Sequence, residues 1–86
     1  MPDFRFAVAV MPKPGILDPQ GRAVEQSLVH LQNVGIEGVR DVRVGRRVEL
    51  TVQAAAEEEA RATASRLAEE LLSNPLIETW VVDLLP

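Results

Sequence analysis

The chain has 86 residues, of which 47 % are hydrophobic and 26 % are charged, with a formal net charge of −4 and no cysteine. A chain of this length is expected to form a single domain, residues 1–86, that buries about 60 to 65 % of its unfolded surface. The lack of cysteine excludes disulfides and thiolate chemistry. The acidic balance argues against nucleic-acid binding, and no apolar run approaches the roughly 20 residues that span a bilayer, so we expect a cytoplasmic protein without nucleic-acid or membrane partners.

The first predicted element is a strand over residues 4–10. Phe4, Phe6, Val8 and Val10 alternate with smaller or charged residues, which is the period of a half-buried strand. Pro12-Lys13-Pro14-Gly15 then predicts a loop, because proline cannot donate to a strand ladder and glycine frees the backbone.

A helix is expected to begin at about Pro19. Asp18 can cap the free amides and Pro19 suits the first helical position, while Gly21 weakens a helix by about 1 kcal/mol relative to alanine. Val24, Leu28 and Leu31 share one face, and Gly35 is placed to end the helix.

Two strands are predicted next, over residues 39–44 and 48–53. A three-residue loop, Gly45-Arg46-Arg47, would pair Val44 with Val48 and Val42 with Leu50, which keeps apolar side chains on one face. We therefore predict that these two strands form a hairpin.

A second helix is predicted over about residues 55–73, followed by a fourth strand over residues 77–84. The helix has a stripe of apolar side chains, and Glu57, Glu58 and Glu59 lie near the positive end of its dipole. The stripe consists of Ala60, Ala64, Leu67, Leu71 and Leu72. The strand has apolar residues of both parities, with Ile77 and Val81 on one side and Trp80, Val82 and Leu84 on the other. Because two helices cover only one face of a sheet, the other face is expected to meet another subunit.

The order of elements is β-α-β-β-α-β, the pattern of ferredoxin-like domains, so the predicted fold class is α+β, with an antiparallel sheet and two helices on one face. We expect this domain to form a homo-oligomer, either a dimer or a tetramer.

The sequence offers no recognisable catalytic constellation. His30 is the only histidine and has no cysteine beside it, so no zinc site or Cys/His pair is predicted. Glu57, Glu58 and Glu59 splay around a helix and are read as a solvated face. There is no serine elbow and no phosphate-binding glycine loop. We therefore predict no catalytic residues and no metal ligands.

Three segments together carry a resemblance to a known family. They are Ile16-Leu17-Asp18-Pro19-Gln20-Gly21-Arg22-Ala23-Val24, then Val39-Arg40-Asp41-Val42-Arg43-Val44-Gly45 with Glu49-Leu50, then Leu71-Leu72-Ser73-Asn74-Pro75-Leu76-Ile77-Glu78. With this spacing the chain resembles the PurS family, the small subunit of phosphoribosylformylglycinamidine synthase, over nearly its whole length.

The resemblance implies a noncatalytic role in purine biosynthesis. A glutaminase subunit would release ammonia, and a large synthetase subunit using ATP and magnesium would convert formylglycinamide ribonucleotide to the amidine. The small subunit would bridge these two partners and bind no cofactor of its own, as part of an ATP-dependent carbon–nitrogen ligase.

Candidate contact residues follow from these readings. Partner docking is predicted for Asp18, Pro19, Gln20, Gly21, Arg43 and Arg47, and an interface between copies for Trp80, Val82 and Leu84. The alternative for Arg43 and Arg47 is solvated charge at a strand edge, and the alternative for Trp80 is a place in the core. Gly21 would let a partner's backbone approach closely, although it could equally ease a tight turn within the chain. The alternative function is a stand-alone regulatory domain that binds a small metabolite near the Pro14-Gly15 loop.

Overall fold

The computed structural model describes residues 1–34 and 36–86, and for residues 32–34 only the backbone. Along the chain it has β1 (Asp3–Pro12), α1 (Pro19–Ser27), a 3₁₀ continuation η1 (Leu28–Val34), β2 (Arg46–Gln53), α2 (Glu57–Leu67), a π-helical continuation η2 (Ala68–Leu72) and β3 (Glu78–Leu84). The predicted α+β class is confirmed, with an antiparallel sheet and two helices.

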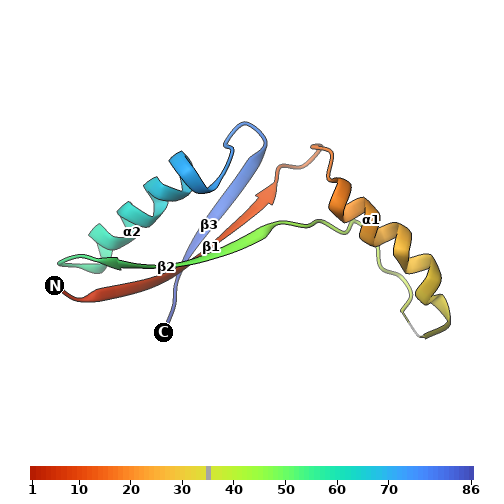
Figure 1. Ribbon diagram of the computed structural model, residues 1–86, viewed down its shortest axis with the longest axis horizontal. Coiled ribbons are helices and arrows are strands. Elements are labelled where there is room, and N and C mark those ends of the chain that lie inside the picture. Colours follow the sequence, from red (N-terminus) through yellow and green to blue (C-terminus); the bar gives the residue numbers. More distant parts are fainter. Residues whose placement is uncertain (35) are drawn as a thin grey trace.

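The sheet has three strands in the order β2-β1-β3, with β1 antiparallel to both neighbours (Figure 1). The predicted four-strand pattern and its hairpin are wrong. Val48 pairs with Val8 and Leu50 with Phe6, rather than with residues 42–44. In the described residues the segment 39–45 belongs to no strand, and Arg46 and Arg47 begin β2.

The core lies between one face of the sheet and α2. Phe6, Val8 and Val10 are fully buried on β1, and they meet Ala60, Ala64 and Ala68, which are also fully buried. Three alanines at intervals of four residues form a flat stripe that lets the helix approach the strands closely. The predicted stripe is therefore correct for Ala60 and Ala64, whereas Leu71 is wrong, because its side chain is 73 % exposed beyond the start of the π-helical turn.

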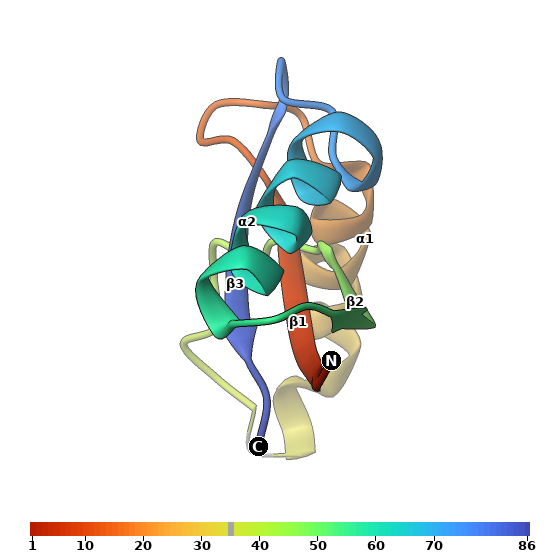
Figure 2. The same cartoon turned by 90° about the vertical axis from the view of Figure 1, so that its left-hand side faces the viewer.

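The two helices do not share a face of the sheet, contrary to the prediction. Helix α2 contacts all three strands, whereas α1 contacts chiefly its own continuation η1. Figure 1 shows α1 beyond the end of the sheet, and Figure 2 shows it behind the layer formed by the strands and α2. We call residues 13–45 the arm and the rest of the chain the body.

The arm makes the molecule long and thin. The principal extents of the whole chain are 54 × 29 × 14 Å and its radius of gyration is 16.9 Å. A compact chain of this length has a radius of gyration of about 12 Å. The helix of the arm begins at Pro19 as predicted and remains helical through Val34. The predicted helix end at Gly35 lies outside the described residues.

Candidate functional site

The base of the arm is organised by the carboxylate of Asp18, which caps helix α1. Its Oδ1 accepts a hydrogen bond from the amide of Gly21 at 3.0 Å, as expected for an N-cap residue. Its Oδ2 accepts a second bond, at 2.8 Å, from the amide of Val44 on the returning chain. One side chain therefore starts the helix and fastens residues 36–45, the return segment, which runs back to the sheet.

These hydrogen bonds favour the ionised form of Asp18. The amide of Gly21, followed by that of Val44, lowers the pKa of this carboxyl below its usual 3.8. Burial opposes these two hydrogen bonds to a smaller extent, and the positive charge of Arg43 adds a still smaller lowering of the pKa. The carboxyl group of Asp18 is therefore ionised at neutral pH.

Gly21 packs against the returning chain. It is the one buried residue of α1, and a Cβ built there would lie closer to the carbonyl oxygen of Val42 than real Cβ atoms ever do. This contact gives Gly21 a role within the chain, namely the close approach of helix and return segment. Its predicted role in docking a partner stays a prediction.

A second carboxylate also accepts a hydrogen bond from a backbone amide of the chain that returns to the sheet, farther along α1. Glu25, on the same helix, accepts a hydrogen bond from the amide of Val42 at 2.7 Å. The amides of Val42 and Val44, which a hairpin would use in its ladder, are therefore satisfied by the carboxylates of Glu25 in α1 and of its N-cap residue Asp18. This is the physical reason why residues 39–45 form no strand.

Two hollows flank the loop that carries Ile16 and Leu17. The first, of about 470 Å³, lies between this loop and the return segment and is bordered by Lys13, Arg22 and Arg43. The second, of about 640 Å³, lies between the arm and the body. It is lined by Pro19, Gln20, Val44, Ile77 and others, and Ile16, Leu17 and Asp18 border both hollows.

On the body side, Arg46 closes the second hollow. Its guanidinium donates to both carboxylate oxygens of Glu78, at 2.7 and 3.0 Å, and to the carbonyl oxygen of Leu72 at 2.5 Å. The same carboxylate accepts the amide of Asn74. The hydrogen bond from Arg46 and then that from Asn74 lower the pKa of Glu78. Arg46 thus joins β2, β3 and the end of η2 at the point where the arm leaves the sheet.

Most of the predicted docking residues are brought together at this base. Asp18, Pro19, Gln20, Gly21 and Arg43 border or underlie the two hollows. Arg47 does not join them, because it lies on β2 and its Nε pairs with Glu49 at 3.2 Å on the open face of the sheet. Contact of these six residues with a partner stays a prediction.

The predicted interface residues lie on the helix-covered face instead of the open one. Trp80, Val82 and Leu84 pair with Val10, Val8 and Phe6, so they point to the α2 side. Trp80 and Val82 pack against the core, and the indole N–H of Trp80 donates to Glu69 at 2.7 Å. These contacts give both residues a place in the core of the monomer, and their part in an interface between copies stays a prediction.

Sequence reasoning missed Glu25, Arg46 and Glu78 as organising residues. Glu25 is one of several exposed-looking acids, and Arg46 was assigned to a turn. The available signal was the pair Asp18 and Glu25, seven residues apart on one helix face and thus able to meet two alternate amides of an extended chain.

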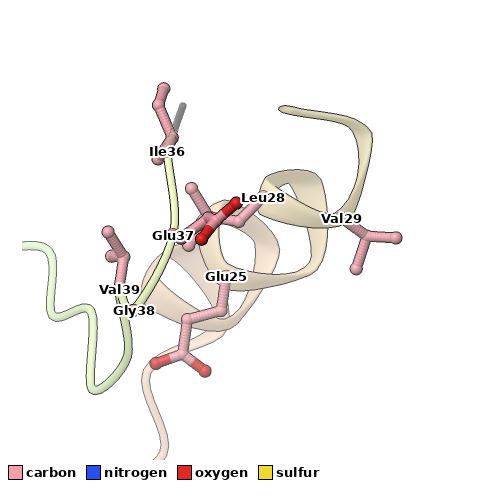
Figure 3. Close-up of a pocket in the computed structure, with 7 residues that line it drawn as sticks. All are labelled: Glu25, Leu28, Val29, Ile36, Glu37, Gly38 and Val39. Atoms are coloured by element: carbon pink, nitrogen blue, oxygen red, sulfur yellow. The ribbon is translucent and has the colours of Figure 1, made fainter. Parts of the chain in front are cut away.

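The far part of the arm is loosely packed. A hollow of about 420 Å³ lies between α1 and the return segment, bordered by Glu25, Leu28, Ile36 and Val39 among others. Val29 also lines this hollow (Figure 3), and its side chain is 62 % exposed. Among residues 1–34 and 36–86 there is no cluster of acidic and histidine side chains placed to hold a metal ion. None of the described helices is long and apolar enough to cross a membrane.

The fold and the site define a small α+β domain that presents a protruding arm with an ordered base. A family model for PurS, described as phosphoribosylformylglycinamidine (FGAM) synthase, matches residues 5–86. The chain therefore belongs to the PurS family.

Individual relatives agree with this assignment. The PurS subunit of phosphoribosylformylglycinamidine synthase from Mycobacterium leprae is 40 % identical, with 91 % of each chain covered. Its counterpart from Synechocystis sp. is 35 % identical over 94 % of this chain and 78 % of the relative. Among solved structures, a chain of PurLQS from Thermotoga maritima superposes with a TM-score of 0.87 at 34 % identity, covering 99 % of this chain and 100 % of that one.

Proposed function

We propose that this chain is the PurS subunit of phosphoribosylformylglycinamidine synthase and that, within the enzyme, it bridges a glutaminase subunit and an ATP-dependent synthetase subunit. The observation that carries the proposal is the match over residues 5–86 to the PurS family together with the superposition on a chain of PurLQS. The reaction served is amidine formation in purine biosynthesis, with ammonia supplied from glutamine.

We place the chemistry in the other subunits. Asp18, Glu25 and Glu78 are engaged by backbone amides or by Arg46, so these carboxylates fasten segments together. We accordingly assign the binding of ATP and magnesium to the large subunit. We also place the assembly in the cytoplasm.

Self-association is part of the proposal. The accessible surface of the chain is 6246 Å², whereas a compact monomer of 9.4 kDa exposes about 5000 Å². The excess is of the size that a protein interface removes. Apolar side chains contribute to it on both the arm and the open sheet face, and examples are Val24 at 44 % and Val81 at 57 % exposure. A monomeric mass at micromolar concentration would contradict this point.

The experiment measures glutamine-dependent amidine formation by purified glutaminase and synthetase subunits, with and without this chain, and with free ammonia as the control donor. We expect the glutamine-dependent reaction to need the chain and the ammonia-dependent reaction to proceed without it. If neither reaction responds and no complex forms on a sizing column, the proposal is wrong, and a metabolite-binding regulatory domain becomes the better reading.

A further inference from the structure

The hollow between the β1–α1 loop and the return segment combines positive charge with exposed apolar surface. Lys13 follows β1, Arg22 lies in α1 and Arg43 lies on the return segment, so three separate segments each bring one cation to the same hollow. Between them, Ile16 and Leu17 expose 38 % and 69 % of their surface.

These cations differ from those of the body. Arg5, Arg46, Arg47, Arg61 and Arg66 each form an ion pair with a glutamate. Within the described parts of the chain, Lys13, Arg22 and Arg43 have no ion-pair partner. Asp18 and Asp41 also line the hollow. The two oxygens of Asp18 are committed to the amides of Gly21 and Val44, and Asp41 forms no ion pair within the described parts of the chain. The three cations therefore outnumber the two carboxylates of the hollow, which leaves an excess of one positive charge.

We propose that this hollow is a docking site for an acidic and apolar segment of another subunit of the enzyme, with carboxylates meeting Lys13, Arg22 and Arg43 and an apolar side chain covering Leu17. The inference rests on the proposed function, since it supposes that the chain assembles with such subunits. Arginines around an apolar centre are the composition of protein interfaces. A small inorganic anion would leave the exposed surface of Leu17 uncovered, so a protein segment fits the site better.

The test uses charge reversal in the full chain, with Arg22→Glu and Arg43→Glu measured for assembly with the glutaminase and synthetase subunits at several salt concentrations. Each reversal is expected to weaken assembly about tenfold or more at low salt and to make it less dependent on salt, because each removes a screened attraction. Arg40→Glu is the matched control. Arg40 is an exposed arginine of the same return segment and lies outside the hollow, so its reversal should have little effect.

Two further measurements keep the outcomes separate. Arg43 lies near Asp18, so its reversal could disturb the base of the arm. Hydrogen exchange of the Val44 amide in the isolated Arg43→Glu chain reports whether the arm stays closed. If the arm opens in that variant, the neutral Arg43→Gln takes its place. If the unmodified chain forms no complex, the proposed function fails. If it assembles and the reversals assemble equally well, this inference fails. If inorganic phosphate saturates the hollow without affecting assembly, the site serves a small anion, and the inference is again overturned.

Discussion

Gly21 lies directly against the carbonyl of Val42, with no room for a Cβ between them. The contact joins the first turn of α1 to the chain that returns to the sheet, and it lies between the two carboxylate–amide bonds made by Asp18 and Glu25. Helix and return segment are therefore held together by backbone proximity and by two hydrogen bonds, with few buried side chains.

Replacing Gly21 with alanine is expected to open the base of the arm. The new methyl group must push the return segment away, a kind of overpacking that costs about 1 to 3 kcal/mol. The measurement is amide exchange at Val42 and Val44, which should become faster while β1 amides stay protected. Gln20→Ala, an exposed neighbour in the same turn, is the control. Unchanged exchange in the Gly21 variant would show that the arm tolerates the side chain.

Acidification is expected to loosen the arm through Asp18. The pKa of this carboxyl is lowered in the folded state, so its stabilising contribution is complete above 3.8 and is lost as the pH falls through its folded pKa. Amide exchange or a chemical shift of Val44 followed below pH 4 reports the change. Asp18→Asn should show the loosened state already at neutral pH, since an amide side chain has one acceptor oxygen for two donors. A pH-independent Val44 signal would argue against the assignment.

Arg46→Lys is expected to weaken the junction between arm and body. A lysine ammonium cannot reproduce the forked contact with both oxygens of Glu78 while it also reaches the Leu72 carbonyl. The melting temperature of the isolated chain should fall by more than in Arg47→Lys, the adjacent control, whose pair with Glu49 is half-exposed. Equal melting temperatures for the two variants would contradict the role given to Arg46.

Ala64→Leu is expected to separate α2 from the sheet. Ala64 is fully buried beside Phe6, and three extra side-chain carbon atoms there should cost about 1 to 3 kcal/mol in the free energy of unfolding. Ala62→Leu, on the exposed side of the same helix, should change it by no more than about 0.5 kcal/mol. Urea unfolding of both variants measures the difference. Similar values would mean that the alanine stripe is not the closely packed surface described above.

The body could largely be predicted from sequence because its elements follow local patterns. Alternation identified β1, whose observed span contains residues 4–10, and the buried pair Ala60 and Ala64 was found from helical spacing. In β1 the side chains that face α2, such as Phe6 and Val8, are large and apolar, and Ala7 on the opposite face is buried as well.

The arm could be predicted only in part. Val42 and Val44 alternate with charged residues as in a strand, but periodicity does not say which group receives the amide hydrogen bonds. The acceptors are carboxylates 17 and 26 residues away in the sequence. The positive φ of 58° at Asp41 also bends the chain before it can pair. The same hydrogen bonds bring the docking candidates around Asp18 together with Arg43. From the sequence alone, the candidates around Asp18 could be placed only at the start of a helix.

The arm is attached to the sheet by two chain segments and closed by two carboxylates, so it can open while the body stays folded. A partner that binds only the closed arm then slows hydrogen exchange at the amides of the arm. The apparent affinity of that partner is reduced in proportion to the fraction of molecules whose arm is open. Binding strength and hydrogen exchange in this subunit are therefore linked quantities. A change deep in the arm, remote from every contact surface, can tune how tightly the complex holds together.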